Sequence, residues 1–159
     1  MTINNNFSDI TYNRKSIRVY DENVKISHEE MLEMIQKATI APSSVNMQPW
    51  RFVVVESPEE KQKLKPLIRF NTRQNDTSSA MILIFGDMEC YEYGEAIYNQ
   101  AVTEGKMSPE VRDQQLAAII PYYKNFTRAE MNDVVKIDSS LAAMQLMLVA
   151  RSYGYDTNP

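Results

Sequence analysis

Residues 42–50 are the part of the chain richest in groups able to bind a ligand. They read Pro-Ser-Ser-Val-Asn-Met-Gln-Pro-Trp and lead directly into residues 51–55, an apolar stretch typical of a strand. The two prolines fix φ and bias the residue before each of them toward extended geometry. Serine and amide side chains donate and accept hydrogen bonds, and Trp50 offers a large apolar wall. A stiff loop of this composition predicts a binding site, although the same residue types also form ordinary turns.

A cluster of cations near the N-terminus is the second candidate. Arg14, Lys15 and Arg18 stand with Ser16 within five consecutive residues of a chain whose net charge is −4. If this stretch is extended, Arg14, Ser16 and Arg18 project to one side, because side chains alternate along a strand. Guanidinium groups bind phosphate oxygens bidentately, so the arrangement suits a phosphate monoester. A solvated basic surface is the other interpretation, and it holds for most short charge runs.

Taken together, the two segments resemble the nitroreductase family of flavin mononucleotide (FMN) enzymes. The family opening is similar to Arg14-x-Ser16-x-Arg18 followed by hydrophobic or aromatic residues, and residues 42–50 match its Pro-Ser-Ser-x-Asn-x-Gln-Pro-Trp segment. Residues 154–159 resemble the start of the family's next flavin-contacting loop. The resemblance extends from about Tyr12 to the last residue, so we expect residues 1–159 to form a single nitroreductase-like domain.

The resemblance implies roles for particular residues. Arg14, Ser16 and Arg18 would hold the phosphate and ribityl chain of FMN, with Lys15 as a further contact. Nitroreductase-like enzymes are intertwined homodimers with flavin at the subunit interface. In such a dimer the loop residues of the second segment would contact the flavin from the other subunit; they are Pro42, Ser43, Ser44, Asn46 and Gln48.

Three more positions follow from the same resemblance. Asn71 is similar to a family asparagine that hydrogen-bonds the pyrimidine edge of the ring, and Gln74 stands where many members have lysine. A neutral amide there would stabilise negative charge at N1 of reduced flavin less than an ammonium would. Asp138 lies where other members have polar residues that reach the flavin across the dimer. Equally, Asp138 would serve as the N-cap of the apolar helix that follows it.

The chemistry that the resemblance implies is carried by the cofactor. NADH or NADPH would pass a hydride to flavin N5 and leave, and a nitroaromatic, a quinone or a similar small flat acceptor would then take its place. This exchange at one site gives ping-pong kinetics. We therefore expect no catalytic side chain, and Ser43 and Ser44 have no histidine close in sequence to activate them.

Two other functions remain open. One is a specialised flavin reductase, such as a reductive dehalogenase or an enoate-type reductase. Its substrate lid would be residues 104–126, with Tyr122, Tyr123 and Phe126, although this region also fits a surface helix pair. The other is a non-catalytic flavin-binding module. It is suggested because family members generally continue beyond the segment matched by residues 154–159, so we expect this chain to be a fragment or a truncated form.

Composition excludes several other classes of protein. The 159 residues are 43% apolar and 24% charged, the balance of a globular domain. A pI near 5.1 argues against a broad nucleic-acid surface. The single cysteine, Cys90, fits a reducing cytoplasm, and no apolar run is long enough to cross a bilayer. One histidine, His28, and no histidine or cysteine cluster give no support to a metal site.

The positions of apolar and capping residues predict the elements that carry these groups. Apolar runs at residues 52–56 and 81–85 predict strands, the second of them central, and residues 89–104 predict a helix. Further helix starts are predicted by the capping patterns at Ser27, Ser57, Ser108 and Thr127. This alternation predicts an α+β sandwich with a small mixed or antiparallel sheet flanked by helices.

The last predicted helix has an unusual composition. Between residues 141 and 150 only Gln145 is polar. A helix that is apolar on nearly every side must be covered on nearly every side. Either a central position in the core or a partner subunit would supply that cover, and a small domain has little interior in which to wrap a whole helix.

Overall fold

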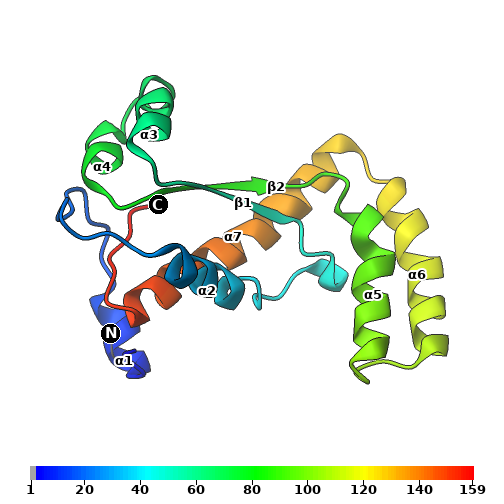
Figure 1. The fold of residues 1–159 in the computed structure, drawn as a ribbon. Helices are drawn as coiled ribbons and strands as arrows, with labels where there is room; N and C mark the ends of the chain where they lie inside the picture. Colours follow the sequence, from blue (N-terminus) through cyan, green and yellow to red (C-terminus); the bar gives the residue numbers. More distant parts are fainter. Residues whose placement is uncertain (1–2) are drawn as a thin grey trace. The chain divides into compact units, whose positions relative to one another are not determined.

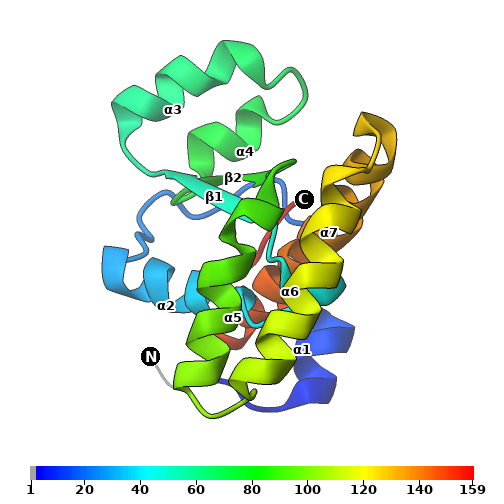
Figure 2. The same cartoon turned by 90° about the vertical axis from the view of Figure 1, so that its right-hand side faces the viewer.

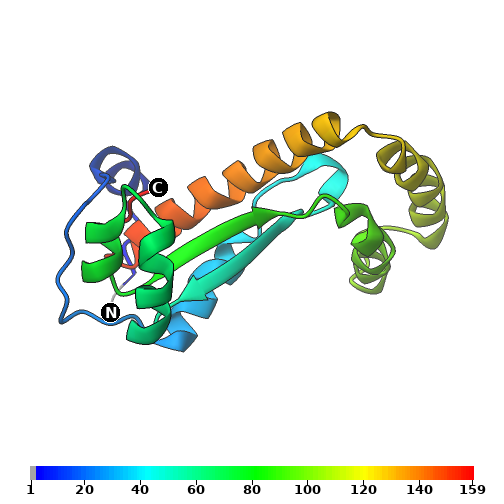
Figure 3. The same cartoon turned by 90° about the horizontal axis from the view of Figure 1, so that it is seen from above.

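The structure is a computed structural model, and it describes residues 3–159. Along these residues, seven α-helices and one two-stranded sheet succeed one another (Figure 1). The helices are α1 (Phe7–Asn13), α2 (His28–Ala38), α3 (Pro58–Leu64), α4 (Thr72–Thr77), α5 (Gly94–Thr103), α6 (Pro109–Lys124) and α7 (Arg128–Ser152). The strands β1 (Trp50–Val55) and β2 (Met81–Gly86) lie side by side and antiparallel (Figure 3). The predicted α+β class is confirmed.

Most helices begin where their capping residues predict. At the starts of α2, α3 and α6, a serine hydroxyl accepts a hydrogen bond from a free backbone N–H. Ser27 accepts from the Glu30 N–H at 3.2 Å, Ser57 from the Glu60 N–H at 3.2 Å and Ser108 from the Val111 N–H at 3.3 Å. Thr127 and Glu130 form a reciprocal capping box at the start of α7, since the Thr127 N–H donates to Glu130 at 2.8 Å and the Glu130 N–H to Thr127 at 3.3 Å. Such caps satisfy N–H groups that have no partner within the helix.

The chain divides into two compact units. Unit 1 comprises the residues up to 40 together with 52–84 and 143–159, and unit 2 comprises residues 41–51 and 85–142. Helix α7 and both strands contribute residues to each unit.

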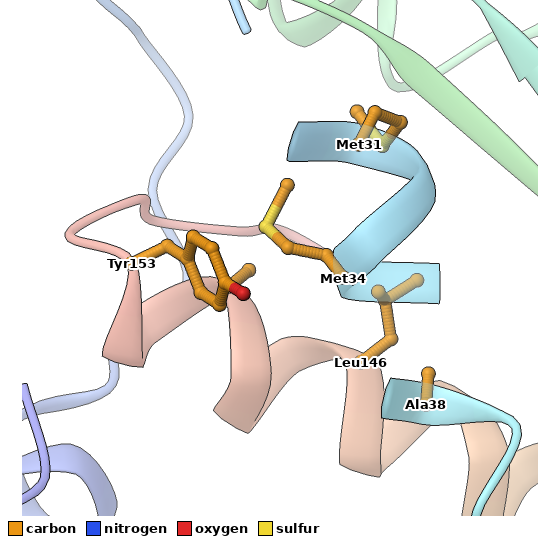
Figure 4. Close-up of a cluster of buried hydrophobic side chains, with 6 residues drawn as sticks. Met31, Met34, Ala38, Leu146 and Tyr153 are labelled. Atoms are coloured by element: carbon orange, nitrogen blue, oxygen red, sulfur yellow. The ribbon is translucent and has the colours of Figure 1, made fainter. Parts of the chain in front are cut away.

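The core of unit 1 forms where α2 meets the last turns of α7 (Figure 4). Met31, Met34 and Ala38 of α2 are buried together with Leu146, Ala150 and Tyr153. Fully burying a side chain such as methionine or leucine contributes about 1.5–3 kcal/mol to folding. Apolar residues of the sheet, including Phe52 and Ile82, pack against this cluster and so attach the strands to the helices.

The core of unit 2 is built around the hairpin of α5 and α6, which run side by side (Figure 2). Met47, Cys90, Tyr98, Tyr123, Met131 and Val135 are its buried members. Cys90 is 0% exposed, and burial raises the pKa of its thiol to about 11. This cysteine is therefore a protonated core residue.

Three local predictions need correction. The helix predicted from residue 89 begins as a 3-10 turn over Cys90–Tyr93, and α5 itself starts at Gly94. Strand β2 is half-buried over residues 81–84 and has one neighbour within the described chain, so it is an edge strand of the sheet that residues 3–159 form. Asp138 is not an N-cap, because the capping box at Thr127 has already started α7 at Arg128. In residues 3–159 no helix combines the length and apolarity needed to span a membrane.

Candidate functional site

The loop singled out from the sequence has a strained backbone. Val45, Asn46 and Gln48 adopt φ values of 44°, 57° and 46°, in the left-handed region that favours glycine. Such a conformation is rare for a β-branched residue such as Val45. Each residue held in this way costs about 1–3 kcal/mol, so the surroundings must hold the loop in place. Strain of this kind concentrates at binding and catalytic sites.

Side chains of unit 2 hold the strained loop at three points. Asp138, 2% exposed, accepts the Ser44 N–H at Oδ2 (2.9 Å) and the Ser44 hydroxyl at Oδ1 (3.2 Å). The Tyr98 hydroxyl donates to the Val45 carbonyl at 3.1 Å, and the Tyr123 hydroxyl donates to the Ser44 carbonyl at 3.4 Å. Burial raises the pKa of Tyr98, and it raises that of Tyr123 to about 12, so both phenols remain donors at neutral pH.

The far end of the loop is closed by its own side chains. The Gln48 N–H donates to Ser43 Oγ at 3.0 Å, and Gln48 Nε2 donates to Asn46 Oδ1 at 3.1 Å. Arg51 donates to the Gln48 carbonyl at 3.0 Å and to Asp87 Oδ2 at 2.8 Å. Within the described residues, these bonds leave the Ser43 hydroxyl proton and the Asn46 amide protons without an acceptor. They are donors that the loop can offer to a ligand.

The basic cluster lies in unit 1, directly after α1. Arg14 ends the helix by donating its N–H to the Ile10 carbonyl at 3.2 Å. In residues 3–159, Arg14, Lys15 and Arg18 form no ion pair with a carboxylate. The chain bends at Arg18, so the predicted alternation of side chains ends there. Three unpaired cations in an acidic chain are the expected feature of an anion site.

Thr157 lies beside this cluster; it belongs to the segment 154–159 singled out from the sequence, although it is not among the predicted site residues. Ser16 and Thr157 pair in a parallel bridge, and the Ile17 N–H donates to the Thr157 carbonyl at 3.1 Å. Thr157 Oγ1 and Arg14 Nη1 are both buried and have no hydrogen-bond partner within the described chain. Burying a polar group without a partner is costly. Two such atoms near one cluster indicate a place where a polar ligand binds.

The turn after α7 brings Thr157 to the cluster. Gly154, with φ of +88°, reverses the chain at the end of α7, a conformation that glycine adopts without steric cost. The Tyr155 N–H then donates to the Ala150 carbonyl at 2.9 Å, and the Tyr155 hydroxyl donates to Glu30 Oε2 at 2.6 Å. Burial and the Glu30 carboxylate raise the pKa of Tyr155 to about 12.

A group of amide side chains completes this part of unit 1. Gln74 is 7% exposed, and its Nε2 donates to Asn71 Oδ1 at 3.2 Å and to Asn158 Oδ1 at 3.3 Å. All three amides line a cavity of about 440 Å³, together with Ile17 and Thr157. The cavity therefore connects the predicted ring-edge residues with the chain next to Ser16.

The model of the Nitroreductase family matches residues 11–159, a match that runs through both compact units. This chain belongs to the nitroreductase family.

Relatives of this nitroreductase-family chain match it along almost its whole length. A Bacillus subtilis protein provisionally named NAD(P)H nitroreductase YdgI is 52% identical over 155 residues, which are 98% of this chain and 74% of that protein. The CLA biosynthesis enone reductase of Lactiplantibacillus plantarum is 41% identical over 157 residues, or 98% of this chain and 72% of that protein.

Solved structures show the same fold. A protein of Staphylococcus epidermidis provisionally named an NAD(P)H:FMN oxidoreductase is 56% identical, with a TM-score of 0.96, over 99% of this chain and 74% of that chain. A protein of Exiguobacterium sibiricum, provisionally named a nitroreductase, was crystallised in complex with FMN. It is 53% identical, with a TM-score of 0.96, over 100% of this chain and 76% of that chain. The nitroreductase-like α+β fold predicted from the sequence is thus confirmed.

The twelve site residues predicted for this nitroreductase-family chain fall into two equal groups. Six lie in unit 1: Arg14, Lys15, Ser16, Arg18, Asn71 and Gln74. Six lie in unit 2: Pro42, Ser43, Ser44, Asn46, Gln48 and Asp138. In unit 1 the cavity brings Asn71 and Gln74 together with the chain beside Ser16. In unit 2 hydrogen bonds join Ser44 to Asp138 and Gln48 to both Ser43 and Asn46.

Sequence reasoning missed several residues that hold the site. Tyr98 and Tyr123 occupy inward positions on α5 and α6, and a buried tyrosine hydroxyl usually has a partner, so a local signal existed for both. Because Tyr123 is only 4% exposed, it is a core residue rather than an element of a mobile lid, whereas Tyr122 is 64% exposed. Thr157 and Asn158 lie in the segment 154–159 that was singled out by resemblance, but no residue type or spacing pointed to either of them individually.

Proposed function

We propose that this chain is an FMN-dependent oxidoreductase that takes electrons from NADH or NADPH. The strongest support is the relative crystallised in complex with FMN, which is 53% identical along the whole of this chain. The names of two other relatives point to the same electron donor, since both contain NAD(P)H. The match of one family model to both compact units also supports treating residues 1–159 as a single domain.

The residues of unit 1 fit the phosphate end of such a cofactor. Within the described residues, Arg14 Nη1 and Thr157 Oγ1 are buried donors without partners, and Ser16 pairs with Thr157 in a parallel bridge. Guanidinium–phosphate hydrogen bonds are charge-assisted, about twice as strong as neutral ones. We expect Arg14 and Ser16 to bind the phosphate, with Arg18 and Lys15 adding positive charge. Asn71 and Gln74, which line the neighbouring cavity, would bind the pyrimidine edge of the ring.

We further propose that the site is completed in a homodimer, by the Ser43–Asn46 loop of a second subunit. Support comes from α7, where Ile137, Leu141 and Met144 are 63%, 43% and 43% exposed. Spacings of four and three residues place them on one face of the helix. Apolar side chains gathered on one face of a helix are typical of an association surface. A second copy of the chain would cover them.

The chain's own groups would bind and orient rather than react. When bound, FMN would take a hydride at N5 from NADH or NADPH and deliver it to a nitroaromatic, a quinone or a similar flat acceptor. Arg14 and Ser16 would hold the phosphate, while Asn46 and Asn71 would fix the orientation of the ring. No side chain is required as a base, and donor and acceptor would use one place in turn with ping-pong kinetics. The free, buried thiol of Cys90 supports a reducing compartment, for which we propose the cytoplasm.

A second candidate acceptor is a conjugated enone. This possibility is supported by the relative named CLA biosynthesis enone reductase, which is 41% identical over 98% of this chain. A solved structure of a protein described as an enone reductase is likewise 41% identical, with a TM-score of 0.87. Such a reaction would use the same cofactor and the same electron donor. It would differ only in the acceptor, which binds after NADH or NADPH has left.

An absorbance spectrum followed by anaerobic titration tests the proposal. We expect the protein, purified or supplied with FMN, to show flavin absorbance that bleaches on addition of NADH or NADPH. Nitroaromatic, quinone and enone acceptors would then restore the colour at different rates, and double-reciprocal plots would be parallel. Bound flavin that never bleaches would indicate a non-catalytic flavin-binding protein. A protein that does not bind added FMN would overturn the proposal.

A further inference from the structure

We infer that Asp138 is a positioning residue of the proposed FMN site, and that it acts by anchoring Ser44. Ser43 and Asn46, and not Ser44, then carry the donors that the loop presents to the cofactor. This inference deepens the proposed function and rests on it. It also differs from the sequence-based expectation, in which Ser44 and Asp138 both contact the flavin directly.

Ser44 has no hydrogen-bond donor left for a ligand. Its N–H and its hydroxyl are both directed to the Asp138 carboxylate, at 2.9 and 3.2 Å. Its carbonyl accepts the Tyr123 hydroxyl at 3.4 Å. Every polar group of Ser44 is therefore engaged within unit 2, and its role is that of an anchor.

Asp138 is equally committed to this contact. The residue is 2% exposed and lies in the interior of α7, where its two carboxylate oxygens accept one hydrogen bond each from Ser44. It forms no ion pair in the described part of the chain. A buried carboxylate must be compensated by hydrogen bonds, so the pair fastens the loop to the helix. Because the residue is only 2% exposed, a cofactor has little access to its carboxylate.

The strained backbone explains why an anchor is needed. Val45, Asn46 and Gln48 all have positive φ, which costs free energy that a released loop would recover by relaxing. The direction of the Asn46 amide depends on this conformation, because the residue itself lies in the strained stretch. Ser43 is tied to the same geometry through the Gln48 N–H at 3.0 Å. Asp138 thus keeps the two free donors preorganised, which lowers the entropy lost on binding.

Four variants separate anchoring from direct contact: Asp138→Ala, Asp138→Asn, Ser43→Ala and Asp133→Ala. Asp133 is a matched control, because it is an exposed acid on the same helix. The measurements are the dissociation constant for FMN, kcat and KM at saturating FMN, and amide hydrogen exchange of residues 44–48 without FMN. The Asn variant keeps the shape of Asp138 and serves if the Ala variant fails to fold.

For Asp138→Ala we expect faster exchange across residues 44–48, and about 10- to 100-fold weaker FMN binding, the range expected for losing hydrogen bonds to a charged group. The kcat of the FMN-saturated enzyme should change less than about twofold, because bound FMN holds the loop in the conformation that Asp138 imposes in the free protein. Ser43→Ala should weaken FMN binding with faster exchange confined to the Gln48 amide, which loses Ser43 Oγ as its acceptor, while residues 44–47 keep the wild-type rate. Asp133→Ala should change neither quantity.

Two results would overturn the inference. In the first, Asp138→Ala and Asp138→Asn leave both the exchange of residues 44–48 and the affinity for FMN unchanged, which would show that the carboxylate does not hold the loop. In the second, FMN affinity falls while exchange stays at the wild-type rate, which would indicate direct contact with the cofactor. If the wild-type protein itself does not bind FMN, the proposed function fails, and hydrogen exchange still decides whether Asp138 anchors Ser44.

Discussion

Asp138 accepts both hydrogen-bond donors of Ser44, a residue 94 positions away in the chain. The contact joins the interior of a helix to a loop in which Val45, Asn46 and Gln48 have left-handed backbone angles. A loop with three such residues does not keep its shape by local preference. Its conformation is imposed by the core of unit 2, through Asp138 and two tyrosine hydroxyls.

Replacing Val45 with asparagine should stabilise the protein. Val45 has φ of 44° and ψ of 32° and is 43% exposed, so the substitution removes strain and loses little apolar burial. Asparagine tolerates this region far better than a β-branched residue, and we expect a gain of about 1 kcal/mol in the free energy of unfolding. Urea denaturation measures it.

Val53→Asn is the control for this substitution. Val53 is 49% exposed and lies in β1, so the same change of side chain there should reduce stability, since asparagine disfavours strands. Equal destabilisation at both positions would show that Val45 is not strained.

The loop also shows what the sequence allowed us to predict. Its composition, with two prolines, two serines and two amides, was sufficient to single it out, because those residue types act locally. The helix starts at Ser27, Ser57 and Ser108 were predicted for the same reason, since a cap and its partner lie three residues apart. Local chemistry of this kind can be read directly from the order of residues.

Contacts between distant residues were not predictable in this way. The N-cap interpretation of Asp138 was wrong because it used only the apolar residues that follow, whereas α7 had already begun at Arg128. Thr157 pairs with Ser16 only through the turn at Gly154 and the Tyr155–Glu30 hydrogen bond. Neither residue carries a pattern that names its partner. Tertiary contacts of this kind need coordinates.

Arg14 should recognise the phosphate of FMN rather than its ring. The guanidinium has a buried Nη1 without a partner within the described chain. We expect Arg14→Ala to weaken FMN binding by about 10- to 100-fold, the effect of losing a charge-assisted hydrogen bond. Binding of riboflavin, which lacks the phosphate, should change little. Titration of flavin fluorescence with both ligands provides the measurement.

Lys63→Ala is the control for Arg14, because Lys63 is an exposed cation of unit 1 that is paired with Glu60. It should leave the binding of both flavins unchanged. An equal loss of FMN and riboflavin binding in Arg14→Ala would place the guanidinium at the ring or show that its role is structural.

Tyr155 should make the protein less stable at alkaline pH. Its pKa is raised from 10.0 to about 12 by burial and by Glu30, so the folded state keeps a proton that the unfolded state releases. Its contribution to stability is therefore complete below pH 10.0 and is lost as pH rises toward about 12. In Tyr155→Phe the free energy of unfolding should fall less steeply over this range.

Part of the slope should remain in that variant, because the pKa values of Tyr98 and Tyr123 are also raised. Glu30→Gln should give an intermediate slope, since it removes the charge and leaves an oxygen that can accept the hydrogen bond. Chemical denaturation at a series of pH values tests both variants. Parallel curves for Tyr155→Phe and the wild type would contradict the assignment.

The exposed apolar residues of α7 should control assembly and, through it, the cofactor. Leu141 is 43% exposed and lies between Ile137 and Met144 on one helical face. In Leu141→Asp a charge would have to be buried at the proposed subunit interface, so we expect the dimer to dissociate at concentrations where the wild type remains associated. Sedimentation equilibrium measures the change, and Lys136→Asp, an exposed position on the same helix, is the control.

Sedimentation equilibrium and FMN binding, measured together on Leu141→Asp, test whether the dimer completes the site. If the loop carrying Ser43 and Asn46 completes the site of the other subunit, FMN binding should fall in proportion to the fraction of monomer. Raising the protein concentration should then restore dimer and FMN binding together in Leu141→Asp. A monomeric variant that binds FMN as tightly as the wild type would mean that each chain holds the cofactor with its own residues. In that case Ser43 and Asn46 would have no part in the partner's site.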